Sequence, residues 1–77
     1  MEQFEPQAHH MLTPREMELI ALMARGMIVK EIARTLLVSE KTVRNHLSNI
    51  YRKCGVYDRV QVVLYALKTG LVDWKEL

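Results

Sequence analysis

Only two residues separate two short helical patterns in the middle of this 77-residue chain, and this spacing is its strongest structural constraint. The first pattern ends at Leu36, and the second begins behind Ser39, a residue type that commonly caps helices. A connection made of Leu37 and Val38 alone fixes the two helix axes at a steep angle. Ala33 is small enough to let the two helices approach closely. The sequence therefore predicts a helix-turn-helix unit.

Helix signals occur in four segments, at residues 14–25, 28–36, 40–54 and 59–69. Three of these segments begin behind a side chain whose oxygen can cap free amides and end at a glycine. The caps are Thr13, Ser39 and Asp58, and the glycines are Gly26, Gly55 and Gly70. The segment at 28–36 has no such oxygen at its start. We predict an all-α fold of four helices in one domain over residues 12–77, behind a flexible arm or linker at residues 1–11.

Composition excludes several classes of protein. The chain is 49% hydrophobic, with three glycines and two prolines, which is typical of a small helical domain and not of a disordered tail or an all-β fold. A single cysteine, Cys54, excludes an internal disulfide. No apolar run approaches the ~20 residues of a membrane span, and the acidic start does not resemble a signal peptide. We expect a cytoplasmic protein that does not associate with membranes.

The segment at 40–54 has two different faces. Apolar residues recur on one face at helical spacing, and these are Val43, Leu47, Ile50 and Cys54. Hydrogen-bond donors recur on the other, and these are Lys41, Arg44, Asn45, Ser48 and Arg52. One helix fits into a DNA major groove, where arginine and asparagine bind guanine and adenine edges through paired hydrogen bonds. The alternative is that this polar face is merely solvated.

The position of each donor along this segment predicts its role on DNA. In such a helix the N-terminal half meets bases and the ends meet phosphates, so we expect Arg44, Asn45 and Ser48 to face bases. Lys41 and Thr42 lie at the helix N-terminus, where the dipole favours a phosphate. Residues 30–59 carry seven cations and three acids, whereas the whole chain has a net charge of only +2. Lys30 and Arg52, within this basic region, are further phosphate candidates.

These residues resemble a known family. The stretches that carry the resemblance are LTPRE at 12–16, KEIA at 30–33 and, most specifically, VSEKTVRNHLSNI at 38–50. They closely resemble the LuxR-type helix-turn-helix domain of bacterial transcription factors, the GerE/NarL/FixJ group, over residues 12–71. The resemblance implies a transcriptional regulator of double-stranded DNA that binds a pseudo-palindromic operator as a homodimer through its fourth helix. It also implies phosphate contacts near Lys53 and Arg59. RNA polymerase is a further candidate partner of such a regulator.

The chain departs from the family's pattern where Ile28 and Val29 replace the usual Ser-Asn or Ser-Thr. This change removes the cap of the second helix and a phosphate contact. It predicts either weaker DNA binding or an apolar contact with a partner.

Apolar residues lie on more than one side of the segment at 59–69. We expect one stripe to face the core, formed by Val60, Val63, Leu64 and Leu67. We expect a second strip to face outward and form the dimer contact, namely Val62, Tyr65, Ala66 and Thr69. The alternative for this strip is ordinary apolar exposure.

No arrangement of residues indicates catalysis, so we expect no enzyme activity, no cofactor and no small-molecule ligand. His46 lacks companions at ligand spacing and is expected at the edge of the core, so we predict no metal site. Cys54 is expected to be a buried, inert thiol. Two other functions stay open at this point, a sigma-factor-like promoter-binding module and a small helical protein-interaction module. The sequence is equally compatible with a free-standing regulator and with the effector domain of a response regulator.

Overall fold

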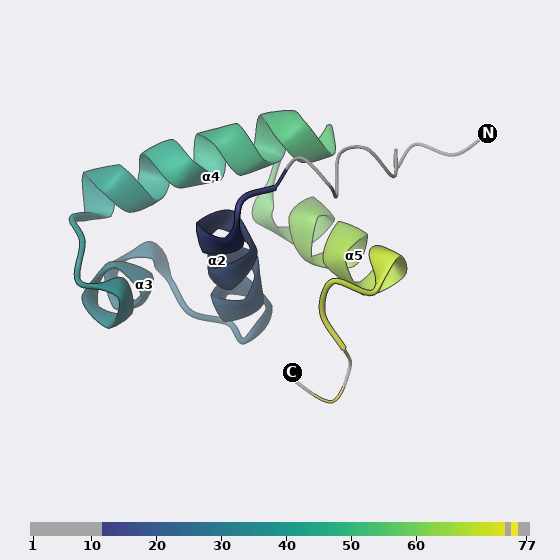
Figure 1. Cartoon of the computed structure of the whole chain (residues 1–77), viewed down its shortest axis with the longest axis horizontal. Helices are drawn as coiled ribbons and strands as arrows, with labels where there is room; N and C mark the ends of the chain where they lie inside the picture. The colour runs from purple at the N-terminus through teal and green to yellow at the C-terminus, as the bar shows by residue number, and fades with distance from the viewer. Residues whose placement is uncertain (1–11, 74, 76–77) are drawn as a thin grey trace.

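The computed structural model describes residues 12–73 and 75, which form four helices and no strand. The helices are α2 (Pro14–Ala24), α3 (Val29–Leu36), α4 (Glu40–Cys54) and α5 (Arg59–Thr69). The longest helix, α4, spans the molecule, with α3 at its N-terminal end, α2 beneath its middle and α5 near its C-terminal end (Figure 1). The all-α expectation is confirmed. The arm predicted at residues 1–11 lies outside the described residues.

Local capping explains where α2 and α4 begin and end. The Thr13 hydroxyl accepts the Glu16 N–H at 3.1 Å, as expected of a cap, and the Glu16 carboxylate accepts the Thr13 N–H at 2.9 Å, which completes a capping box. At the start of α4 the Ser39 hydroxyl accepts the Thr42 N–H at 3.0 Å. Gly55 ends α4 in the left-handed conformation (φ +70°), which a residue with a side chain adopts only with strain. The predicted bounds of these helices are confirmed to within one residue.

The starts of α3 and α5 follow a different pattern. Ile28 has no side-chain oxygen to offer, and the Glu31 carboxylate, which accepts the Ile28 N–H at 3.0 Å, supplies only half of a capping box. Asp58 caps α5 by accepting the Gln61 N–H at 2.9 Å. In a capping box the Gln61 carboxamide would accept the N–H of Asp58, but here it accepts the N–H of Tyr57, one residue earlier.

A single apolar core lies among the four helices. Its members on α4 are those predicted, Val43, Leu47, Ile50 and Cys54. On α2 the buried apolar residues are Leu19, Ile20 and Met23; helical spacing in the sequence alone favours a different face, with Met17, Ile20, Ala21 and Ala24, so the core face is rotated from that pattern. Val72, beyond α5, closes the core and donates its N–H to the Ala66 carbonyl at 3.2 Å.

The predicted core stripe of α5 is wrong at two of its four positions, because Val63 and Leu67 pack partly buried against the core and Val60 and Leu64 do not. Val60 and Leu64 are 67% and 48% exposed, whereas Val62, Tyr65 and Ala66 are fully buried. Apolar residues surround almost the whole of this helix, so periodicity alone could not identify the inner side. The Arg59 guanidinium donates to the Met23 carbonyl in the last turn of α2 and to the Met27 carbonyl in the loop after it, and this anchor at the first residue of α5 helps to set its rotation.

The same rotation corrects the predicted dimer contact. Val62, Tyr65 and Ala66 are core residues, so they cannot meet a second subunit while the domain stays folded. Thr69 is half-buried, and its hydroxyl donates to the Tyr65 carbonyl at 2.8 Å. A dimer contact on α5 must therefore use the opposite side of the helix.

Candidate nucleic-acid interface

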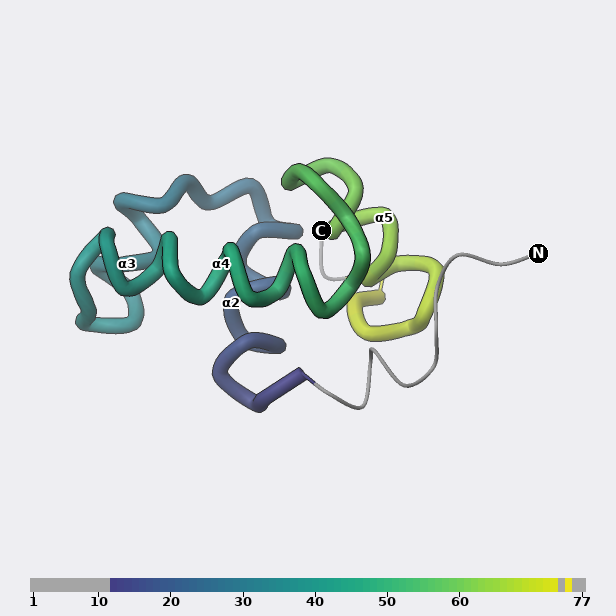
Figure 2. The backbone as a smooth tube through the Cα atoms, turned by 90° about the horizontal axis from the view of Figure 1, so that it is seen from above, coloured from purple at the N-terminus to yellow at the C-terminus, as the bar shows by residue number. Residues whose placement is uncertain are grey.

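The turn between α3 and α4 positions the candidate interface. Leu37 adopts the left-handed conformation (φ +60°, ψ +43°), and this reverses the chain within two residues. The Val38 N–H donates to the Ala33 carbonyl at 3.0 Å and closes the turn. Ile32 and Ala33 are buried beside Val43, so α3 packs on the N-terminal part of α4, as the view from above also shows (Figure 2). This is the predicted helix-turn-helix arrangement.

The polar face of α4 is open to solvent. The donors predicted to meet DNA lie on this exposed side, namely Lys41, Arg44, Asn45, Ser48 and Arg52. Thr42 is half-buried, and its backbone N–H already donates to the Ser39 hydroxyl, so only the Thr42 hydroxyl is available to a phosphate. Lys30 is exposed on α3. The structure thus keeps every predicted base-facing residue on one accessible surface.

Two hydrogen bonds order long side chains on this face. Arg44 donates from Nη2 to Oε1 of Glu40 at 3.2 Å, one turn earlier. Arg52 donates from Nη2 to Oδ1 of Asn49 at 2.5 Å. Glu40 is the sole acidic residue in the α4 sequence. The i,i+4 spacing of Glu40 and Arg44 is the sequence signal for such a pair.

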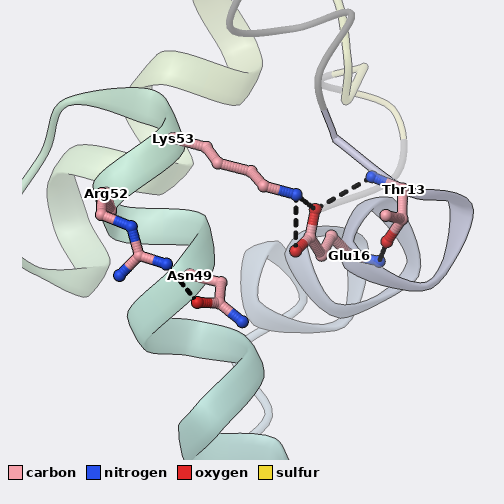
Figure 3. A network of polar contacts seen from close by, with 5 residues as sticks. All are labelled: Thr13, Glu16, Asn49, Arg52 and Lys53. Carbon is pink, nitrogen blue, oxygen red and sulfur yellow. Dashed lines mark hydrogen bonds and ion pairs between the residues drawn. The ribbon is translucent and has the colours of Figure 1, made fainter.

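Lys53 and Arg59 bind partners inside the fold. The Lys53 ammonium lies 2.8 Å and 3.1 Å from the two carboxylate oxygens of Glu16, and the dashed lines in Figure 3 show both contacts. The Arg59 guanidinium binds two backbone carbonyls, one in the last turn of α2 and one in the loop after it. The expected phosphate contacts of Lys53 and Arg59 stay predictions, and they would compete with these bonds inside the fold. Lys30, Lys41, Thr42 and Arg52 are therefore the stronger phosphate candidates.

Glu16 has a second role, as the buried partner of Lys53, that its neighbours in the sequence do not indicate. Burial by itself would raise the pKa of Glu16, but the hydrogen bonds from Lys53 and from the Thr13 N–H outweigh it and hold the pKa below its ordinary value. The local pattern predicted the cap correctly. It gave no sign of Lys53, which lies 37 positions away.

Other reactive side chains do not add chemistry to this surface. Burial, with a further contribution from the Glu16 charge, raises the pKa of the Cys54 thiol to about 11, so this buried thiol stays protonated at neutral pH. His46 is half-buried at the edge of the core. Among residues 12–73 and 75, no group of three or more His, Cys, Asp or Glu side chains is placed to hold a metal ion. In the same part of the chain, no helix combines the length and apolar character needed to cross a membrane.

Comparison with known proteins decides the family. The family model described as bacterial regulatory proteins of the luxR family matches residues 10–66. The chain belongs to the LuxR family. This LuxR-family chain carries the helix-turn-helix domain of DNA-binding transcription regulators, as the resemblance at residues 12–71 implied.

The LuxR-family relatives differ in length. The spore germination protein GerE of Bacillus subtilis is 46% identical over 73 residues, which cover 95% of this chain and 99% of GerE. The transcriptional regulatory protein DegU of Brevibacillus brevis is 48% identical over 63 residues, covering 82% of this chain. The response regulator protein VraR of Staphylococcus aureus is 45% identical over 65 residues, which cover 84% of this chain. The chain spans only 27% of DegU and 31% of VraR.

Proposed function

We propose that this LuxR-family domain regulates transcription by inserting α4 into the major groove of double-stranded DNA. One observation carries the proposal, namely that the side of α4 opposite the core is an uninterrupted, exposed set of donors. A groove lined with acceptors and flanked by phosphates complements such a surface. Its buried side is fixed by Val43 and Ile50, so the helix can present the polar side without rearranging.

The residues divide into two roles by their place on α4. Arg44 and Asn45 extend from the N-terminal half, where guanine and adenine edges are within reach of a docked helix, and Ser48 lies one turn farther along. Phosphate contacts come from the periphery. These residues are Lys41 and Thr42 at the helix start, Lys30 on α3 and Arg52 near the helix end.

The test separates base recognition from general attraction to DNA. A half-site is first obtained by selection from random duplexes, and dissociation constants are then measured on that site and on random DNA over a range of salt. Arg44→Ala or Asn45→Ala should weaken binding to the selected site roughly 5- to 150-fold, corresponding to about 1–3 kcal/mol per bidentate contact, and should relax preference at single bases.

Arg15→Ala is the matched control, because Arg15 is an exposed, ion-paired arginine on α2. It should leave base preference unchanged. Equal losses on selected and random duplexes for Arg44→Ala would argue against base recognition. Salt-independent binding of the wild type to duplex would instead favour the protein-interaction module.

We further propose that two copies bind adjacent half-sites through the exposed side of α5. Val60 and Leu64 are large, exposed apolar side chains one turn apart on α5, and Tyr57, in the loop just before the helix, is a third exposed apolar side chain. A two-fold contact here would match half-sites that lie one helical turn apart.

Val60→Glu should abolish cooperative binding to a duplex with two half-sites and preserve binding to one half-site. Unchanged cooperativity would place the contact elsewhere. A dimer bound in this way at a promoter would act on RNA polymerase.

A further inference from the structure

One residue at the edge of the polar face of α4 carries a charge that opposes DNA binding. Glu40 is the first residue of α4 and the sole acid in that helix, and its partly exposed side chain lies at the edge of the donor face, where it pairs with Arg44. A carboxylate in that position is repelled by the DNA backbone unless a cation compensates it. The compensating cation is Arg44, whose Nη2 lies 3.2 Å from the Glu40 Oε1.

We propose that Glu40 is a positioning residue that sets base specificity by holding the Arg44 guanidinium toward the bases. This inference depends on the proposed function, because it assigns the partner of a base-facing arginine. Glu40 precedes Arg44 by four residues, and this order of acid and base gives the favourable orientation along a helix.

The geometry of the pair leaves Arg44 able to bind DNA. A guanidinium carries five N–H donors in a planar fork, and the contact with Glu40 engages Nη2 alone. The remaining donors suffice for a bidentate contact with a guanine edge. Restraint before binding also reduces the conformational entropy that the long side chain loses when it docks.

The negative charge of Glu40 also acts against wrong complexes. On a non-cognate duplex, an unrestrained Arg44 can turn to a phosphate and gain affinity without reading a base. With Glu40 present, that movement breaks the ion pair and leaves a carboxylate beside the DNA backbone. Specificity here would come from a repulsive group as well as from an attractive one.

The test compares Glu40→Gln with Glu18→Gln in the full chain. Glu18 forms an exposed i,i+3 ion pair with Arg15 on α2, so the control removes the same charge from a similar pair on another helix. Binding is measured on the selected half-site, on sites changed at the base that Arg44 reads, and on random duplex. Glu40→Gln should tighten binding to random duplex about two- to fivefold and lower discrimination at that base at least about threefold. Glu18→Gln should leave discrimination as in the wild type.

A double variant distinguishes positioning from direct contact. In the Arg44→Ala background, Glu40→Gln should have no further effect on discrimination, because the group it positions is absent. An equal effect of Glu40→Gln in both backgrounds would show that Glu40 contacts a base itself and would overturn the proposal. If Arg44→Ala alters discrimination and Glu40→Gln does not, the positioning role fails and the proposed function stands. If Arg44→Ala alters no base preference, the assignment of Arg44 fails first.

Discussion

The ion pair between Glu16 and Lys53 gives the sharpest stability prediction. Its carboxylate is 5% exposed and its ammonium-bearing side chain 24% exposed, and it ties the first turn of α2 to the last turn of α4. Glu16→Gln tests the charge alone, because the glutamine oxygen can still accept the Thr13 N–H that completes the capping box. The variant replaces one charged acceptor by an amide beside Lys53.

The size of the effect follows from burial. Removing one partner of a fully buried ion pair costs about 3–5 kcal/mol, because the remaining charge stays uncompensated. Lys53 is partly exposed, so its ammonium regains some hydration, and the loss should be nearer that of one charge-assisted hydrogen bond, about 2 kcal/mol. For a domain of this size the melting temperature should fall by roughly 8–16 °C.

The pH dependence gives an independent measurement. The folded-state pKa of Glu16 lies below its ordinary value of 4.5, so its contribution to stability is complete above that pH and is lost as pH falls through the folded pKa. Denaturant unfolding followed by circular dichroism at pH 7 and pH 3 should therefore show a difference between wild type and Glu16→Gln that shrinks in acid. Glu18→Gln, in an exposed pair, should stay within about 0.5 kcal/mol of wild type. A Glu16→Gln loss below about 0.5 kcal/mol at pH 7 would refute the reasoning.

Four further substitutions test the local structure by urea unfolding. Ile28→Ser should raise the free energy of unfolding by about 0.5–1 kcal/mol, because Ile28 is 56% exposed and has no side-chain oxygen to cap α3. A serine would complete the capping box whose other bond is made by Glu31, and no gain in stability would contradict this explanation. Leu37→Gly should raise the free energy of unfolding by about 0.5–1 kcal/mol, because it removes the strain of a left-handed backbone at a residue that is 89% exposed. A lower free energy of unfolding would mean that the Leu37 side chain makes a stabilising contact. Val62→Glu should cost at least about 3 kcal/mol by burying a charge, whereas Val60→Glu should change stability by less than about 0.5 kcal/mol; equal losses would contradict the assigned rotation of α5.

The sequence alone predicted the features that depend on neighbouring residues. The caps at Thr13, Ser39 and Asp58 act across three positions, so each is readable from a few letters. The two faces of α4 were equally readable, because apolar and polar residues alternate there at helical spacing with little ambiguity. The core residues of α4 and its candidate DNA-facing residues therefore followed directly from the pattern.

Tertiary structure alone decided the features that depend on distant residues. The inner side of α5 was ambiguous because both sides are apolar, and the packing of Tyr65 and Val62 against the other helices selects one of them. Lys53 and Arg59 looked like phosphate ligands because charge is visible in a sequence, whereas a partner 32 to 37 positions away is not. Folding places Lys53 beside the Glu16 carboxylate and Arg59 beside the Met23 carbonyl. Each cation loses water there, so it needs a hydrogen-bonding partner within the protein. Local chemistry thus determined the helices and the candidate recognition face, and only the packing of the helices decided which cations are available to DNA.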